Sequence, residues 1–232
     1  MARLWGWRVP KRGLGLLMTD DGLALAQSQA TVSSGGQHCA WHWHRWSAND
    51  TQQTSGAWPD PVQLKKALAR SGFQAQATAV AVPEAQLQRF SLSLEPGQSK
   101  RQMHAAIAAQ LGSLLPHPVH ESVWDFELQQ AQAPAHAAPH AQPAWLQAAM
   151  QAQAAPTAEV LVLTRAWVSA CEHFCRAAGL QLVRLEPPWQ ASSRWQVFAQ
   201  NHADRASAPV AQALTAQQQA VLGGLALGVV MP

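Results

Sequence analysis

The sequence predicts a mixed α/β protein, α+β in part, because strand and helix patterns succeed one another along it. Three stretches indicate this most directly. Residues 77–82 form an apolar run that stops at Pro83, which is typical of a buried strand. Residues 103–114 repeat apolar side chains at helical spacing, and residues 123–128 alternate with period two. With the strand expected at residues 87–94, the order within residues 77–127 is strand, strand, helix, strand.

The N-terminal third predicts a hairpin, a third strand and a helix. Two apolar runs, residues 14–18 and 23–26, flank an Asp-Gly dipeptide of the kind that forms tight hairpin turns. Residues 38–46 alternate as a strand does. A helix is expected to begin at Pro61, a residue suited to the first helical turn, and to end at residues 71–72.

The middle of the chain predicts an edge strand and a capped helix. Residues 87–94 alternate loosely, as expected of a strand at the edge of a sheet. Ser99 and Gln102 form a capping-box pattern at the start of the helix. Pro116 and Pro118 end it. The apolar stripe of this helix comprises Met103, Ile107, Leu111 and Leu114.

The C-terminal part begins with residues 128–158, which contain no charged residue and are rich in Ala, Gln, Pro and His, so they predict a flexible insertion. Two strands are expected at residues 160–163 and 180–185. A helix between them has a core stripe of Trp167, Cys171, Phe174 and Ala178. After a polar stretch, a last apolar helix carries Gly224 and Gly228, a spacing that indicates close helix packing.

Composition excludes several classes of function. Charged residues are 12% of the 232 residues, the net charge is +3, and no Lys/Arg cluster indicates a nucleic-acid surface. Three cysteines predict a reducing compartment rather than a disulfide framework. No segment has the roughly 18 apolar residues of a membrane span, so any membrane association is expected to be peripheral. Residues 1–12, which are basic and contain Trp5 and Trp7, are either a membrane-surface contact or a loose terminus.

Two groups of residues could in principle bind a metal ion, and for both we adopt a structural role instead. His38, His42 and His44 would share one face of a strand and could ligate zinc, but no fourth ligand suggests itself. Cys171 and Cys175 share a helix face, where a metal edge or a redox pair is the alternative to small buried hydrophobes. No metal site and no catalytic residues are predicted.

Three segments carry a resemblance to a known family. They are AVAVPEAQLQRFSLSLEP, LGSLLPHPVHESVWDFEL and EVLVLTRAWVSACEHFCRAAGLQLVRLEP, which together cover roughly residues 60–190. In order and spacing the chain resembles the PilM family of type IV pilus assembly proteins, in the actin-like superfamily that also holds the cell-division protein FtsA. The resemblance implies an actin-like, RNase H-like main subdomain, residues 1–84 and 190–232. It also implies an inserted small subdomain, residues 85–189, built of strand-helix-strand units and carrying the insertion 129–158, and no second lobe.

The resemblance also implies where a nucleotide would bind. Family members have a phosphate-binding turn of the pattern Asp-Ile-Gly-Ser-Ser, followed by a Lys. Here Met18 stands at the acid, Ala24 stands near the Lys, and Asp20 and Asp21 would repel a phosphate beside Gly22. We therefore expect a degenerate turn, no cofactor and no ATP binding.

The function implied is that of a non-enzymatic scaffold, a pseudo-ATPase of type IV pilus biogenesis, located in the cytoplasm at the inner membrane and serving pilus assembly and twitching motility. It would bind the cytoplasmic tail of a PilN-like inner-membrane protein and so connect indirectly to pilus-assembly ATPases. Two alternatives stay open: an actin-like ATPase completed by a partner chain or a dimer, and a cytoplasmic scaffold of type II secretion. Homo-oligomerisation also stays open. The partner-binding residues expected are Pro83, Arg89, Phe90, Pro116 and Pro118.

Overall fold

The computed structural model describes residues 12–19, 22–33, 36–47, 60–70, 72–129, 155–201 and 214–230, with the backbone alone at residues 19, 22, 29–33, 36–47, 201 and 230. The chain divides into a larger unit, Met1–Glu84 with Ser169–Pro232, and a smaller unit, Ala85–Val168. Four expectations lie outside the described residues: the N-terminal segment, the acids at positions 20 and 21, the greater part of the insertion, and the histidine side chains of residues 38–44.

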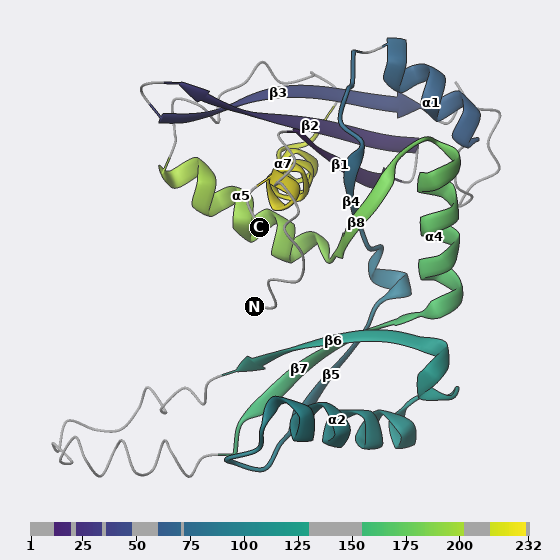
Figure 1. Cartoon of the computed structure of the whole chain (residues 1–232), viewed down its shortest axis with the longest axis vertical. Helices are drawn as coiled ribbons and strands as arrows, with labels where there is room; N and C mark the ends of the chain where they lie inside the picture. Colours follow the sequence, from purple (N-terminus) through teal and green to yellow (C-terminus); the bar gives the residue numbers. More distant parts are fainter. Residues whose placement is uncertain are drawn as a thin grey trace, which may run out of the picture. The chain divides into compact units, whose positions relative to one another are not determined.

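The larger unit is built on a five-stranded mixed sheet (Figure 1). Strands β1 (Arg12–Thr19), β2 (Gly22–Ser33) and β3 (Gly36–Ser47) form an antiparallel meander. Strands β4 (Ala77–Ala81) and β8 (Gln181–Glu186) continue it in parallel, which gives the order β3-β2-β1-β4-β8. The predicted hairpin is confirmed, since Thr19 pairs with Gly22, and its strands are longer than the apolar runs alone indicated.

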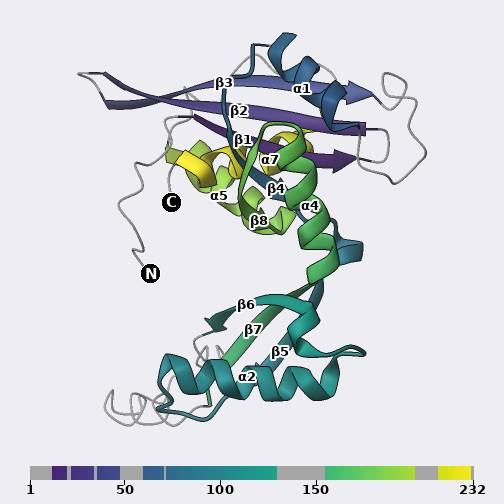
Figure 2. The ribbon, with the colours of Figure 1, turned by 45° about the vertical axis from the view of Figure 1, so that its right-hand side comes forward.

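Side-chain size distinguishes the two faces of this sheet. Helix α7 (Ala216–Val230) lies across one face, and α5 (Pro188–Asn201) packs on α7 (Figures 1 and 2). With the exception of Leu17, the residues that the strands present to α7 in these contacts are small, namely Gly13, Gly15, Ala24, Ala26, Ala77, Ala79 and Ala81. The alternate positions carry the bulkier Leu14, Leu16, Leu23, Leu25 and Val80, all buried. In Figures 1 and 2 helices α1 (Pro61–Arg70) and α4 (Arg165–Ala177) lie on that other side of the sheet.

The small residues allow the backbones to approach closely. A Cβ atom added to Gly15 would lie 2.6 Å from the carbonyl oxygen of Leu222 on α7. One added to Gly224 would lie 1.7 Å from the carbonyl oxygen of Ala191 on α5. Both distances are far below van der Waals contact, so only glycine fits at these positions without moving a helix. The expectation that Gly224 serves close helix packing is therefore confirmed.

A buried ion pair joins three elements of the larger unit. The Arg194 guanidinium of α5 donates to both carboxylate oxygens of Glu186 at the end of β8, with 2.8 Å between Nη1 and Oε2. Nη1 also donates to the carbonyl oxygen of Gly224 on α7, at 2.8 Å. The Glu186 side chain is only 4% exposed. Two-point pairing of this kind gives both strength and orientation, so it holds α5 against β8 and α7.

The smaller unit is a three-stranded antiparallel sheet covered by one helix. Its strands β5 (Gln88–Ser93), β6 (Ser122–Gln129) and β7 (Thr157–Thr164) have the order β5-β7-β6, so β5 is an edge strand, as expected. Short 3₁₀ turns, η2 (Glu84–Gln86) and η3 (Val119–Glu121), precede β5 and β6. Helix α2 (Lys100–Leu114) begins with the predicted capping box, in which Gln102 N–H donates to Ser99 Oγ and the Gln102 side chain accepts from the Ser99 N–H.

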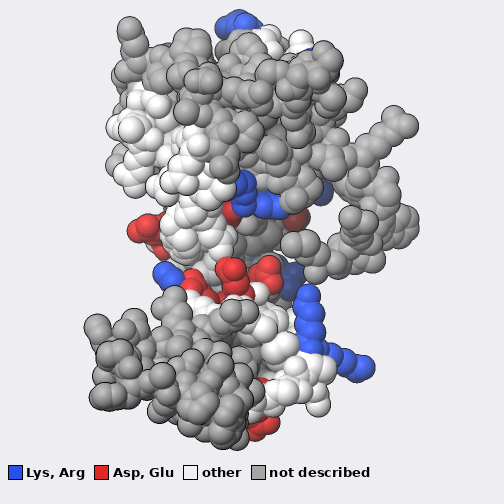
Figure 3. Space-filling view, turned by 90° about the vertical axis from the view of Figure 1, so that its left-hand side faces the viewer, with Lys and Arg blue, Asp and Glu red and all other residues white. Residues whose placement is uncertain are grey.

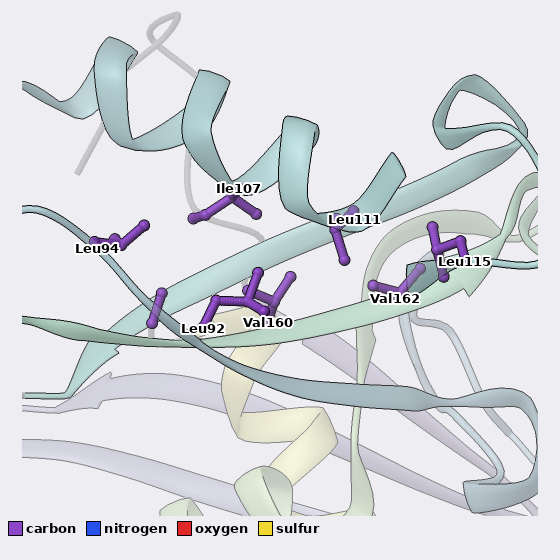
Figure 4. Packing of buried hydrophobic residues seen from close by; sticks show 8 residues of the cluster. Leu92, Leu94, Ile107, Leu111, Leu115, Val160 and Val162 are labelled. Atoms are coloured by element: carbon purple, nitrogen blue, oxygen red, sulfur yellow. The ribbon is translucent and has the colours of Figure 1, made fainter. Parts of the chain in front are cut away.

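One side of this sheet and the inner stripe of α2 form the core of the smaller unit (Figure 4). Ile107 and Leu111 are fully buried against Leu92, Val160 and Val162. The prediction for Leu114 is wrong, because this side chain is 50% exposed and Leu115 is buried in its place. The helix ends at Leu114, and the extended backbone of Leu115 (φ −81°, ψ 142°) directs its side chain inward.

Two expectations about organisation need correction. Residues 169–189 were assigned to the small subdomain, but β8 pairs in parallel with β4 and therefore belongs to the larger sheet. The smaller unit accordingly contains one helix between strands rather than two strand-helix-strand units. The polar stretch after Pro187 is in fact helix α5, whose buried side chains, Ala191 and Phe198, face α7.

Candidate partner-binding surface

Met18 and Ala24, two residues of the degenerate phosphate turn, lie in the paired strands of the β1–β2 hairpin. Met18 is half-buried and pairs with Leu23 across the hairpin. Ala24 is fully buried and packs with Leu214 and Leu222. A lysine at this position would have to place its ammonium group in an apolar contact, which is costly without a partner. Position 24 therefore belongs to the core of the larger unit.

Two of the residues expected to bind a partner, Pro116 and Pro118, lie near the end of the smaller sheet at which β5 and β6 begin. There Gln88 starts β5 opposite Val162, and Ser122 starts β6 opposite Thr164. Pro116 and Pro118, both exposed, lie in the loop that leads into Ser122. Pro83, half-buried, belongs to the larger unit and directly precedes the turn that leads to β5. The topology therefore brings Pro116 and Pro118 to the end of the sheet at which β5 begins.

The loop at this end is held by polar contacts. Arg165 Nε donates to the carbonyl oxygen of His120 at 2.9 Å, and its Nη2 donates to that of Ser122 at 3.2 Å. His117 Nε2 lies 2.9 Å from Ser122 Oγ. These contacts fix a short proline-rich loop to the first residue of α4, so the exposed prolines are presented by an ordered backbone.

Arg89 and Phe90 lie side by side on β5 but point to opposite faces of the sheet. Phe90 packs partly against the core beneath α2. Arg89 lies on the opposite face, where its Nε is 2.5 Å from Glu159 Oε1 of β7. A ligand on one face of the sheet would reach one of these residues only. A strand added along the outer side of β5 would contact both, because its own side chains alternate between the same two faces.

The two cysteines of α4 are free and fully buried, as expected of small core residues. The hydrogen bond with Cys175, together with burial, raises the pKa of the Cys171 thiol well above its ordinary value. Within the described part of the chain, no three His, Cys, Asp or Glu side chains gather as a metal site would require. None of the helices described is both long enough and apolar enough to cross a membrane.

Comparison with known proteins gives a structural likeness. No protein-family model matches the sequence, and no curated protein matches it. The structure is similar to a chain of a PilM-PilN type IV pilus biogenesis complex, with a TM-score of 0.57 and 16% identity, over 82% of this chain and 51% of that one. It is also similar to the cytoplasmic domain of EpsL, an inner-membrane component of the type II secretion system of Vibrio cholerae. That match has a TM-score of 0.44 and 14% identity, over 78% of this chain and 58% of that one.

The first likeness establishes the fold. This chain is a mixed α/β protein with an actin-like fold, as the resemblance of its sequence segments implied. It spans about half the length of the PilM-PilN chain that it matches.

Proposed function

We propose that this chain is a non-enzymatic scaffold of type IV pilus biogenesis that binds the cytoplasmic tail of a PilN-like inner-membrane protein. In this role it acts in the cytoplasm at the inner membrane and connects indirectly to the pilus-assembly ATPases. It uses no nucleotide and performs no reaction. The fold similarity to a structure from a PilM-PilN complex is the observation that carries the proposal.

The geometry of β5 supports a peptide-binding mode. Among the residues that the structure describes, no strand pairs with the outer side of β5. Its backbone can therefore accept an extended peptide by strand addition, with Arg89 on one face and Phe90 on the other. The exposed Pro116 and Pro118 extend the same end of the sheet. In this arrangement backbone hydrogen bonds supply affinity, and the flanking side chains supply selectivity.

The positions of the phosphate turn support the absence of nucleotide chemistry. Phosphate binding at such a turn needs a cation and free backbone N–H groups. Ala24, where the resemblance implies a lysine nearby, is enclosed by Leu214 and Leu222. Met18 takes the place of the expected acid and pairs within the hairpin.

Calorimetric titration of the full chain tests the proposal. The ligands are the N-terminal peptide of the PilN-like protein encoded in the same genome and, separately, ATP with magnesium. We expect micromolar binding of the peptide and no heat from ATP. Arg89→Ala should weaken peptide binding about tenfold, whereas Arg101→Ala, which removes the same charge from the exposed side of α2, should leave it unchanged.

The outcomes separate the candidate functions. ATP binding at micromolar affinity would replace the scaffold with an actin-like ATPase. Absence of peptide binding would refute the partner assignment. Equal loss of affinity in the Arg89 and Arg101 variants would show that net charge, rather than the β5 edge, governs binding.

A further inference from the structure

The second edge strand of the smaller unit, β6, has few of the devices that usually protect an edge from pairing. Proteins protect exposed edges with charged side chains, lysine above all, with proline, with a bulge or with a very short strand. The charged side chains of β6, Asp125 and Glu127, are both acidic. Strand β6 has eight residues, SVWDFELQ, with neither lysine nor proline. Its register with β7 is continuous from Ser122 to Gln129, without a bulge. Within the described ranges, no strand lies on its outer side.

The two faces beside this edge differ in chemistry. On the face that carries α2, Trp124 and Phe126 are half-buried, with 4.2 Å between the ring centroids of His104 and Trp124, and Leu128 is 43% exposed. On the opposite face Asp125 and Glu127 are exposed. In Figure 3 Asp and Glu side chains gather on one side of the smaller unit, and Lys or Arg side chains are seen beside them. A strand added to this edge would therefore meet apolar side chains on one face and carboxylates on the other.

Among the described residues of the smaller sheet, no ion pair is seen for the carboxylates of β6. Glu127 is directly opposite Glu159 of β7, and like charges in cross-strand positions repel. Arg89, a cation on this face, pairs with Glu159, and Gln129 donates to the other oxygen of the same carboxylate at 2.7 Å. Asp125 lies opposite Leu161, which offers no charge, and its Oδ1 accepts the N–H of Phe126 at 2.9 Å. A cationic neighbour beyond the outer side of β6 would relieve this repulsion.

We propose that the β6 edge binds an extended segment of another protein in which Lys or Arg alternates with apolar residues. The basic side chains of the added strand lie beside Asp125 and Glu127. Its apolar side chains cover Trp124, Phe126 and Leu128. Because side chains of a strand alternate between faces, this pattern matches β6 from Trp124 to Leu128. Val123, on the face of Asp125, is apolar and 37% exposed, so the added strand needs an apolar residue there. The surface is distinct from the β5 edge, so it does not depend on the proposed binding of a PilN-like tail.

Charge also argues against a second copy of this chain as the occupant. Two β6 strands paired antiparallel about a two-fold axis would bring the same faces of the two sheets together. Asp125 and Glu127 of one copy would then lie beside the same carboxylates of the other. Such like-charge pairs are destabilising, whereas an alternating basic strand gains an opposite-charge pair at each of these positions.

The test uses the full chain and two synthetic peptides, acetyl-KVKVKVK-amide and acetyl-EVEVEVE-amide. We expect the lysine peptide to bind at least tenfold more tightly than the glutamate peptide, with an affinity that falls as salt is raised. Glu127→Lys should weaken the lysine peptide about tenfold and strengthen the glutamate peptide. Glu95→Lys, the same charge change at an exposed position outside β6, should do neither.

A second measurement reports strand pairing itself. In an added strand, alternate residues direct their N–H and C=O groups to the partner strand. N-methylation of the lysine peptide at one alternate set of residues should therefore abolish binding, and at the other set should preserve it. The proposal is overturned if both peptides bind equally, if neither binds, or if both N-methylated forms retain affinity. Self-association of the chain that protects the β6 amides from hydrogen exchange would also overturn it, in favour of a second copy.

Discussion

Substitution of Gly224 by alanine tests the close packing of α5 on α7. The added Cβ would lie 1.7 Å from the carbonyl oxygen and 2.4 Å from the carbonyl carbon of Ala191. These are backbone atoms, so no rotamer change relieves the overlap. Restoring contact at about 3.5 Å requires the two helices to separate by roughly 1.5 to 2 Å. Separation on this scale also stretches the hydrogen bond from Arg194 to the carbonyl oxygen of Gly224, now 2.8 Å.

The loss of stability in Gly224→Ala follows from the overlap with Ala191 and from the stretched hydrogen bond to Arg194. Overpacking of a well-packed core costs about 1 to 3 kcal/mol. Weakening a hydrogen bond to a charged group adds about 1 to 2 kcal/mol, partly offset by the higher helix propensity of alanine. We therefore expect Gly224→Ala to lower the free energy of unfolding of the larger unit by about 2 to 4 kcal/mol.

Urea unfolding, followed by hydrogen exchange of the amides in β1 and α7, measures the effect. The matched control is Gly112→Ala on α2, where the nearest atom to the added Cβ is 3.8 Å away. That control should be neutral or stabilising by up to about 1 kcal/mol, because it only removes backbone freedom from the unfolded chain. A Gly224→Ala protein as stable as the wild type would refute the inferred helix contact.

Three further substitutions test other parts of the structure. Leu111→Ala should destabilise the smaller unit by about 2 to 5 kcal/mol, because the Leu111 side chain is fully buried. Leu114→Ala on the same helix should cost under about 1 kcal/mol. Equal losses of stability in urea unfolding would contradict the assigned buried stripe of α2. Glu186→Gln should cost about 3 kcal/mol, because it leaves Arg194 without its buried counter-charge, while Glu172→Gln on the exposed side of α4 should be neutral in thermal unfolding. Cys171 should resist alkylation by iodoacetamide at pH 8 in the native protein and react in urea, because its hydrogen bond with Cys175 and its burial raise the thiol pKa. Rapid labelling of the native protein would contradict the inferred protection of Cys171.

Local patterns predicted most elements of the fold correctly. The capping box at Ser99 and the hairpin between β1 and β2 depend on contacts within a few residues, so they are visible in the sequence. Helix α5 was missed because Ser192, Ser193 and Arg194 make its sequence polar. Its buried positions, Ala191 and Phe198, are identified by the helix that covers them.

For the two candidate surfaces, too, the sequence predicted one part and only the structure showed the other. The prediction that residues 87–94 form an edge strand came from their loose alternation, and β5 is an edge. Strand β6 has a regular alternation that would suit either an edge or an interior position. Within the described part of the chain, β6 pairs with β7 alone, and its cross-strand register places Glu127 opposite Glu159.

Local sequence thus specified most of the helices, strands and turns, with α5 the exception, because propensity, capping and periodicity act over a few residues. It also indicated an actin-like fold through the order of its segments. Tertiary structure alone decided that β8 joins the larger sheet, since parallel pairing with β4 connects residues about a hundred positions apart. It likewise decided which backbones the glycines meet. The spacing of Gly224 and Gly228 indicated close packing, but only the packing of distant elements places Gly15 against Leu222 and Gly224 against Ala191.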